Sequence, residues 1–298
     1  MPGEFDFLAW IRRQQKAWPH VRIGSGDDLA AIDWPAADLL LVGVDQVLDG
    51  VHFDSAIHSP KQIGRKAMNR NLSDCGAMGC LPAAAVATVA LPRDYPLAKA
   101  QELYFGLAEA GEAFGCPIIG GDTGSWDGKL VVTVTILGRA AGVQPIQRSG
   151  AKVGDGIYVT GALGGSILGR HLTFEPRVNL GRSLASGAHP IHAMIDLSDG
   201  LSRDLAHICR ESGVGALLNA EKIPVHADAI ELGRRDSVSP LEHALHDGED
   251  YDLLFTGPIA DYPATRIGTI VAGSGVSIQQ AGQSSTPLEP RAWQHQLG

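Results

Sequence analysis

Residues 117–138 of the chain read PIIGGDTGSWDGKLVVTVTILG, and two structural signals follow one another within them. Lys129–Gly138 holds a core of alternating valine and threonine, a composition that predicts a β-strand. Pro117–Gly121 predicts a short strand that runs into a glycine turn, which leaves Asp122 at the end of that strand. Ligands of α/β proteins usually bind at strand ends. The stretch therefore predicts a sheet that presents Asp122 to a ligand.

Helices and strands alternate outward from this stretch in both directions. Apolar residues at helical spacing predict helices over Phe5–Trp18, Lys61–Met78, Leu97–Phe114 and Leu201–Ser212. Apolar and β-branched runs predict further strands over Leu39–Val44, Ala83–Leu91, Gly156–Thr160, Ile191–Leu197, Val214–Leu218 and Asp252–Thr256. The Leu39–Val44 run is apolar without interruption, which predicts a strand buried on both faces. The alternation as a whole predicts an α/β (α+β) fold.

The order of elements restarts after Gly142, and a polar stretch containing glycine and proline covers residues 140–154. Domain boundaries favour such stretches, and 298 residues are enough for two ordinary domains. We therefore expect two domains, over residues 1–142 and 143–298.

Composition excludes several classes of partner. The chain has 24 Lys and Arg against 33 Asp and Glu, a net charge of −9, and no basic run, so we expect no nucleic-acid partner. No apolar stretch reaches the roughly 20 residues that span a bilayer, and the first residues lack a secretory pattern. We expect no membrane partner and a cytoplasmic location. The four cysteines form no C-x-x-C pair, which predicts buried thiols in a reducing compartment.

Acidic residues recur in short turns that contain glycine or serine, at the ends of predicted strands. The turns are Gly26-Asp27-Asp28, Val44-Asp45, Asn71-Leu72-Ser73-Asp74, Gly120-Gly121-Asp122-Thr123, Asp196-Leu197-Ser198-Asp199-Gly200 and Asp247-Gly248-Glu249-Asp250. Any one of them is explained by ordinary turn chemistry. Six together call for a joint explanation, because carboxylates that gather without cations repel each other. Mg²⁺ takes oxygen ligands and bridges to phosphates, so the turns predict a magnesium-dependent phosphate site.

The usual nucleotide-binding loops are missing. No G-x-x-x-x-G-K-[ST] loop occurs, and Gly24-Ser25-Gly26 runs into two aspartates, the wrong charge for a pyrophosphate. The glycine-rich loop Gly161–Ser166 follows a predicted strand, so its N–H groups could bind phosphate. A simple packing turn explains that loop equally well.

Seven motifs, in order along nearly the whole chain, identify a resemblance. They are Gly24-x-Gly26-Asp27-Asp28, Asp49-Gly50-Val51-His52-Phe53, Asn71-Leu72-Ser73-Asp74-x-x-Ala77-Met78-Gly79, Gly120-Gly121-Asp122-Thr123, Arg148-Ser149-Gly150-Ala151, Asp196-Leu197-Ser198-Asp199-Gly200-Leu201 and Gly248-Glu249-Asp250-Tyr251. The chain resembles the thiamine-monophosphate kinases, which belong to the superfamily of aminoimidazole-ribonucleotide synthetase. The Gly-Gly-Asp and Asp-x-Ser-Asp-Gly patterns are shared across that superfamily. The Gly-Val-His-Phe, Arg-Ser-Gly-Ala and Glu-Asp-Tyr patterns indicate the thiamine-phosphate branch.

The resemblance implies a two-domain fold whose N-terminal sheet pairs with its twin in a homodimer, with ATP and metals in a cleft near the dimer interface. It implies that ATP and thiamine monophosphate give ADP and thiamine diphosphate by direct in-line transfer, with several Mg²⁺ ions and no covalent nucleophile. The matching metal ligands are Asp28, Asp45, Asp74, Asp122, Asp196 and Asp199. The matching nucleotide contacts are Gly121, Asp122, Arg148 and Ser198, and the substrate contacts are His52, Glu249 and the aromatic Trp293.

The sequence departs from the family pattern at a few positions. Gly43 and Val44 stand where the family usually has Ser or Thr, and Asp247 adds a carboxylate beside Glu249. The departures leave open a different acceptor, as in an aminoimidazole-ribonucleotide synthetase-like enzyme. A non-catalytic nucleotide-binding paralogue also stays open, and Gly43 and Val44 favour it.

Overall fold

A computed structural model describes residues 4–24 and 29–291 of the chain. The chain folds as two units, the first comprising Met1–Cys75 and Cys80–Gly142, the second Gly76–Gly79 and Val143–Gly298. Asp28 and Trp293, both expected at the functional site, lie outside the described residues. Within the described part, no helix combines the length and the apolar character needed to cross a membrane. All four cysteines are buried and unbridged, as predicted.

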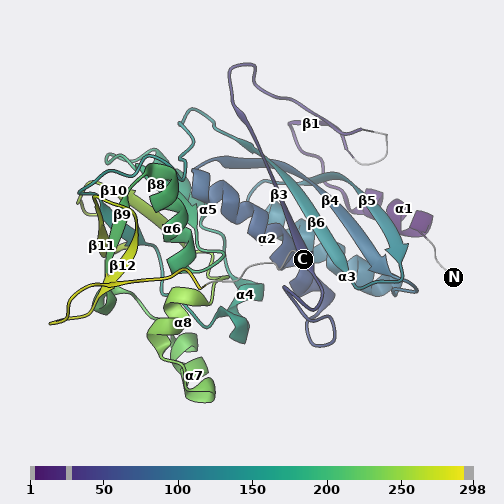
Figure 1. Cartoon of the computed structure of the whole chain (residues 1–298). Helices are drawn as coiled ribbons and strands as arrows, with labels where there is room; N and C mark the ends of the chain where they lie inside the picture. The colour runs from purple at the N-terminus through teal and green to yellow at the C-terminus, as the bar shows by residue number, and fades with distance from the viewer. Residues whose placement is uncertain (1–3, 25–28, 292–298) are drawn as a thin grey trace. The chain divides into compact units, whose positions relative to one another are not determined.

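The first unit is a four-stranded sheet with helices against it. Its elements are α1 (Glu4–Gln14), β1 (Val21–Ile23), β2 (Ala31–Ile32), β3 (Leu40–Leu48), α2 (Pro60–Met78), β4 (Leu81–Pro92), α3 (Leu97–Glu112), β5 (Ile118–Trp126) and β6 (Val131–Arg139). The sheet has the order β3-β6-β4-β5, while β1 and β2 form a separate pair (Figure 1). Among the described strands of this unit, only β4 and β5 run parallel, and α3 is the crossover between them that parallel strands require.

Two glycines set the distance between α2 and α3. A Cβ placed on Gly64 would lie 2.2 Å from the Leu103 carbonyl oxygen, and one on Gly106 would lie 2.1 Å from the Lys61 carbonyl oxygen. Both distances are far below van der Waals contact, so the two backbones touch where any side chain would separate them. This close crossing holds α2, which carries the Asn71–Asp74 motif, near the sheet.

The prediction that Leu39–Val44 is buried on both faces is wrong. Residues of β3 alternate in exposure, and Leu40, Val42 and Val44 are 52%, 62% and 61% exposed. Asp45 and Val47 lie on the other face, where Val47 is fully buried. A continuous apolar run indicates two apolar faces but does not show what covers them. Among the described residues, the helix side of β3 is covered and its other face is exposed.

The short strand predicted over Pro117–Gly121 is also longer than expected. Strand β5 continues to Trp126, because β4 supplies a parallel partner for every residue from Gly120 onward. Asp122 therefore lies within the strand, opposite Thr88, and not in a turn at its end.

The second unit is built on a mixed seven-stranded sheet. Its elements are β7 (Gly156–Val159), η1 (Ser166–Leu168), α4 (Arg170–Thr173), α5 (Val178–Ala185), β8 (Ala193–Asp196), α6 (Leu201–Ser212), β9 (Gly215–Asn219), η2 (Ala220–Lys222), α7 (Ala227–Asp236), α8 (Pro240–His246), β10 (Leu253–Gly257), β11 (Thr265–Val271), β12 (Gly275–Gln279) and β13 (Thr286–Pro287). The strand order is β13-β12-β9-β11-β7-β10-β8. Helix α6 has the predicted bounds and is followed by Gly213, whose φ of +66° suits a left-handed cap.

The second unit also contains Gly76–Gly79, the last turn of α2 and the residue after it. A Cβ on Gly181 of α5 would lie 2.0 Å from the Gly76 carbonyl oxygen. Arg182 donates to the Gly79 carbonyl at 3.3 Å. These four residues therefore pack as part of the second unit, although about sixty residues of the first unit follow them in the chain.

Candidate functional site

Two predicted metal ligands lie on the helix side of the first unit's sheet. Asp45 of β3 forms an ion pair with Arg70 of α2, with 3.4 Å between Oδ1 and Nη2. A Cβ on Gly43, two residues earlier on the same face, would lie 3.7 Å from Oδ2 of Asp74. The structure thus brings the carboxylates of Asp45 and Asp74 to the same short segment of β3.

Asp122 lies on the opposite face of that sheet. The pairing aligns Gln46, Thr133, Thr88 and Asp122 in one row across the four strands. Gln46 donates to the hydroxyl of Thr133 at 3.0 Å, and Thr88 and Asp122 are exposed. Asp122 therefore shares a face with the exposed Val42 and Val44, and within the first unit it does not join Asp45 and Asp74.

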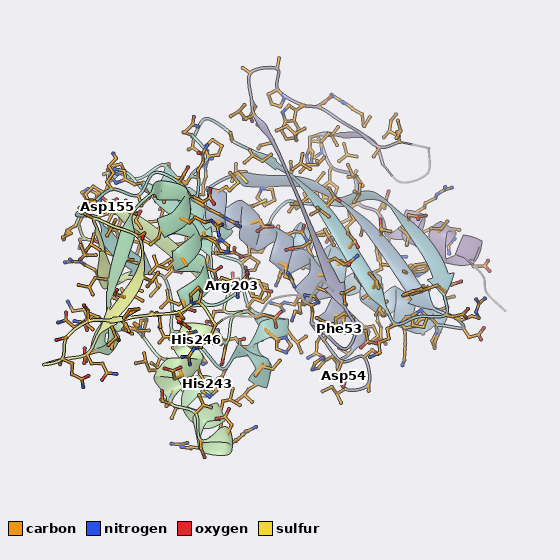
Figure 2. All side chains as sticks on the ribbon, viewed as in Figure 1. Phe53, Asp54, Asp155, Arg203, His243 and His246 are labelled. Carbon is orange, nitrogen blue, oxygen red and sulfur yellow. The ribbon has the colours of Figure 1, made fainter. Side chains whose placement is uncertain are left out.

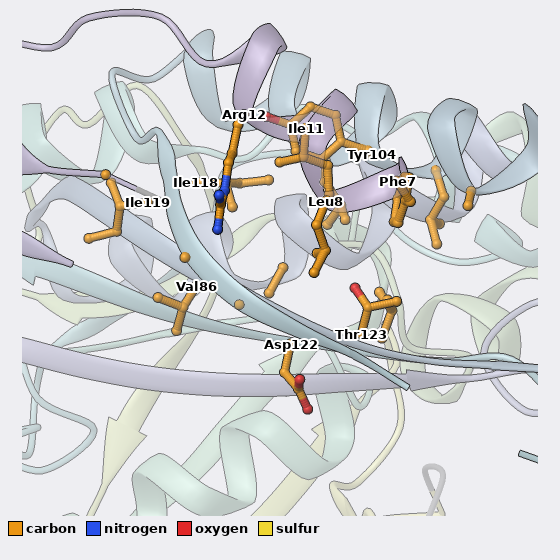
Figure 3. Close-up of a pocket in the computed structure, with 18 of the residues that line it drawn as sticks. Phe7, Leu8, Ile11, Arg12, Val86, Tyr104, Ile118, Ile119, Asp122 and Thr123 are labelled. Carbon is orange, nitrogen blue, oxygen red and sulfur yellow. The ribbon is translucent and has the colours of Figure 1, made fainter. Parts of the chain in front are cut away.

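An apolar cavity of about 330 Å³ lies between α1, α3 and the sheet of the first unit (Figure 3). Phe7, Leu8 and Ile11 of α1 and Tyr104 of α3 line it. Its wall also includes two predicted nucleotide contacts, Gly121 and Asp122. Figure 3 shows the Asp122 carboxylate pointing away from α1, whereas Thr123 points toward it. The sequence analysis missed this cavity, because its lining comes from five separate segments of the chain.

His52 is held in a loop anchored by a buried lysine. Lys66 of α2 is fully buried, and its Nζ donates to the His52 carbonyl oxygen at 2.5 Å. The His52 ring accepts from the Leu48 N–H at 3.1 Å through Nδ1. Asp49 caps the same loop by accepting from the N–H and hydroxyl of Ser55. Figure 2 shows the adjoining Phe53 and Asp54 in this loop. Asp49 therefore has a structural role in a motif that otherwise indicates substrate binding.

In the second unit, the turn Asp196–Gly200 connects β8 to the first turn of α6. A residue that the sequence analysis missed, Asp204, secures this turn. Its Oδ2 accepts from the N–H groups of Asp199 and Gly200, both at 3.1 Å, and the side chain is buried. Burial raises the pKa of Asp204 well above its usual value, and the carboxylates of Asp196 and Asp199 raise it further. Three carboxylates thus gather at the N-terminus of α6, where the helix dipole favours negative charge.

Glu249 lies beside this turn. Its N–H donates to the Ser198 carbonyl at 2.8 Å, and the Tyr251 N–H donates to the Leu197 carbonyl at 2.9 Å. The structure therefore brings a predicted substrate contact, Glu249, next to a predicted nucleotide contact, Ser198. Their sequence separation of about fifty residues made this neighbourhood invisible to the sequence analysis.

Arg148 does not join them. Ser212, at the C-terminal end of α6, accepts from the N–H groups of Gly150 and Ala151 at 3.1 Å each. Ser198 precedes the opposite end of that helix, and twelve residues span about 18 Å. The main chain of Arg148 is therefore about one helix length from Ser198. Burial lowers the pKa of His207, midway along α6, and the charge of Arg148 contributes to that lowering.

The carboxylates present could supply only part of the ligand shell of a Mg²⁺ ion. Within residues 4–24 and 29–291, no three His, Cys, Asp or Glu side chains converge closely enough to hold a metal ion. Mg²⁺ commonly binds through one or two carboxylates, with water and substrate phosphates completing its shell. Asp45 with Asp74, and Asp196 with Asp199, satisfy that smaller requirement.

Comparisons with known proteins agree along the whole chain. Residues 26–140 match the family model described as AIR synthase related protein, N-terminal domain. The thiamine-monophosphate kinase of Rhodopirellula baltica is 40% identical over 309 residues, which cover 98% of this chain and 97% of that protein. The Aquifex aeolicus enzyme of the same name is 31% identical, with 98% of both chains covered.

Solved structures give the same result. The thiamine-monophosphate kinase from Stenotrophomonas maltophilia superposes with a TM-score of 0.78 at 31% identity, covering 92% of this chain and 94% of that one. The structure of AaThiL complexed with AMPPCP and TMP also has a TM-score of 0.78, at 29% identity, with 98% and 97% covered. A hydrogenase maturation protein, HypE, shares the fold at 18% identity with a TM-score of 0.76.

Proposed function

The chain belongs to the thiamine-monophosphate kinase family, and from that premise we propose that it transfers the γ-phosphoryl group of ATP to thiamine monophosphate. An oxygen of the acceptor phosphate attacks the γ-phosphorus in line with the bond to the β–γ bridging oxygen. That bond breaks, and the products are ADP and thiamine diphosphate. The reaction needs positioning and charge neutralisation and no covalent nucleophile.

The observation that carries the proposal is the main-chain bond of 2.8 Å between Glu249 and Ser198. A phosphotransferase must bind its donor and its acceptor side by side. Ser198 is the proposed contact to the nucleotide phosphates, and Glu249 is the proposed contact to the acceptor. His52 in the first unit is the second proposed acceptor contact, and its loop is held in place by the buried Lys66.

The cavity of the first unit is our proposed site for the adenine base. Its lining is apolar and aromatic, with Phe7 and Tyr104, as a purine requires. Two proposed nucleotide contacts, Gly121 and Asp122, belong to its wall, and the Asp122 carboxylate points away from α1. Arg148 remains a proposed nucleotide contact through its side chain alone.

The proposed Mg²⁺ ligands are Asp45 and Asp74 in the first unit, Asp196 and Asp199 in the second, and Asp122. Bound Mg²⁺ supplies positive charge that offsets the repulsion between the donor and acceptor phosphates. Position 43 bears on this directly, because a side chain there would face Asp74. A side chain at Val44 points to the opposite, exposed face. Of the departures at Gly43 and Val44, only the one at Gly43 therefore concerns a proposed metal ligand.

We also propose a homodimer formed through the exposed face of the first unit's sheet. Large apolar side chains at Leu40, Val42 and Val44 are unusual on a solvent-facing sheet and indicate a protein interface. A two-fold contact would use the same face of both copies. Because Asp122 shares that face, the second copy would lie next to it. Four reduced cysteines and the use of ATP agree with a cytoplasmic location.

Purified protein incubated with ATP, Mg²⁺ and thiamine monophosphate tests the proposal, with thiamine diphosphate measured by chromatography. Stoichiometric thiamine diphosphate and ADP support it, and the activity should disappear in EDTA. Release of ADP without thiamine diphosphate would indicate a different acceptor. Nucleotide binding without turnover would indicate the non-catalytic reading, which Gly43 favours.

A further inference from the structure

Each residue of the segment Glu249–Asp252 contacts one side chain from residues 170–177. The pairs are Arg170 with Asp250, His171 with Glu249, Phe174 with Tyr251, and Arg177 with Asp252. The two arginine pairs have N–O distances of 2.9 and 2.8 Å, and the two rings stack with centroids 3.9 Å apart. These four partners lie within eight consecutive residues, which begin with α4.

Glu249 is held in a conformation that it would not adopt unaided. Its φ is +53° and that of Tyr251 is +55°, in the left-handed region that costs a side chain of this size free energy. Nδ1 of His171 lies 3.3 Å from Oε2 of Glu249, and the Tyr251 hydroxyl donates to Oε1 at 3.4 Å. Each carboxylate oxygen therefore has a partner, in a segment already held by its main chain.

The two partners differ sharply in burial. The side chain of His171 is 1% exposed, whereas that of Glu249 is 23% exposed. An ionised carboxylate only accepts hydrogen bonds, so an imidazole nitrogen 3.3 Å away can engage it only as a donor, through Nδ1–H. The arrangement thus combines a buried imidazole with a carboxylate on a side chain that stays partly exposed.

We propose that His171 is a positioning residue that orients Glu249 to bind the cationic, organic end of thiamine monophosphate. This inference rests on the proposed function. A carboxylate repels the phosphate of that molecule, so it must face the other end, which offers a thiazolium cation and an aminopyrimidine donor. An exposed glutamate samples several rotamers, and binding would have to immobilise it. With His171 and Tyr251 holding both oxygens, the side chain is fixed before the substrate arrives.

Two substitutions separate the hydrogen bond from the volume. The amide of Asn stands the same number of bonds from Cα as Nδ1 does, so His171→Asn keeps a donor toward Glu249. His171→Leu has the same branching without a donor. A hydrogen bond to a charged group is worth roughly 1.5–3 kcal/mol, so His171→Leu should raise KM for thiamine monophosphate about 10-fold or more. KM for ATP should stay within about 2-fold, and His171→Asn should stay close to wild type.

His192→Leu is the matched control, because it removes another histidine–carboxylate pair from the same unit, one whose histidine is partly buried. His192 contacts Asp155 through Nδ1 at 2.9 Å, and no contact of its side chain with residues 249–252 is present in the described chain. The His192→Leu variant should leave both KM values unchanged. The Tm of all three variants is measured as well, so that any loss of stability is known. Glu249→Gln should raise the same KM as His171→Leu, and the double variant should be no worse than the poorer single one.

The outcomes separate the two proposals. A wild-type chain that makes no thiamine diphosphate overturns the proposed function, and this inference with it. An active wild type whose His171→Leu variant keeps its KM for thiamine monophosphate overturns the inference alone. So does an equal rise in both KM values, or a His171→Asn variant as impaired as His171→Leu, since either result means that the histidine only supports the fold.

Discussion

Gly43 and Asp74 face each other on the helix side of the first unit's sheet, and a Cβ at position 43 would lie 3.7 Å from Oδ2 of the aspartate. The nearest other atom to that Cβ would be Cγ2 of Ile136 at 3.5 Å. Both are ordinary van der Waals distances, so the space for a small side chain exists and this chain leaves it empty. A residue that can donate an oxygen would stand directly beside a proposed metal ligand.

We therefore expect Gly43→Ser to lower the Mg²⁺ concentration needed for half-maximal activity, because a hydroxyl there adds an oxygen beside Asp74. The Tm should change little, since the Cβ causes no clash. Activity measured across a Mg²⁺ titration checks this. Val44→Ser, on the exposed face, is the control and should leave the titration unchanged. An equal shift in both variants would mean that the effect does not involve Asp74.

Asp122→Asn should reduce turnover by about 10²–10³-fold, the usual consequence of removing one electrostatic contact in a transition state. The Tm should hold, because Asp122 is exposed and the amide fits the same space on the strand. Steady-state kinetics and thermal melting without metal give the two readouts. Asp127→Asn, which removes another exposed carboxylate just beyond the same strand, should retain activity. An unfolded Asp122→Asn protein would assign the residue to the fold.

Gly106→Ala should destabilise the chain, because its Cβ would lie 2.1 Å from the Lys61 carbonyl oxygen and α2 and α3 would have to separate. Overpacking of this kind typically costs about 1–3 kcal/mol. Gly124→Ala meets no atom within 4 Å and serves as the control. Denaturant unfolding measures both. A Gly106→Ala variant as stable as wild type would show that the two helices can separate freely.

His243 should make stability depend on pH. It lies on α8 (Figure 2), with Nδ1 3.0 Å from Asp247 and Nε2 3.3 Å from Asp236. Burial lowers the pKa of His243, but the two carboxylates outweigh burial and hold the pKa above its usual 6.5. Protonated His243, with its two carboxylate partners, thus contributes stability that is complete below pH 6.5 and is lost as the pH rises through the raised pKa of the folded state. The Tm difference between wild type and His243→Gln should be largest near pH 5.5 and smaller at pH 8.5. A difference that grows with pH would contradict this sign.

Val42→Lys should convert the proposed dimer to a monomer, because it buries a charge in the centre of an apolar interface. Light scattering at several protein concentrations measures the mass. Ile57→Lys replaces a side chain that is 75% exposed in the loop between β3 and α2, and it should leave the mass unchanged. A wild-type chain that is monomeric at every concentration would reject the dimer.

The sequence predicted best those elements whose signals are local. Helix α6 was predicted over its observed range, since its apolar spacing and the glycine that follows it are both visible in a dozen residues. The predicted strand ends at Gly121 because two glycines suggest a turn. Its pairing with β4 shows that strand β5 continues beyond them. The burial of β3 was misjudged for the same reason, because covering a face depends on what packs against it.

The candidate site follows the same rule. Motifs indicated the acidic residues, but no local pattern could show that Asp122 and Asp45 lie on opposite faces of one sheet. Asp204 could have been suspected from its place in the first turn of a helix that follows an acidic turn. His171 could not, because its relation to Glu249 spans nearly eighty residues and exists only in the folded chain.

The contact between Gly76 and Gly181 has a consequence for how the protein can be divided and synthesised. A fragment that starts at Val143 would lack the helical turn against which α5 rests, and would expose backbone that normally has no room for a solvent layer. Residues 76–79 leave the ribosome long before the rest of their unit, so this unit reaches completion only by reaching back to a segment made earlier. Recombination between relatives at residue 142 would take residues 76–79 from one parent and the rest of their unit from the other. The backbones at Gly76 and Gly181 would then have to fit together although they come from different proteins.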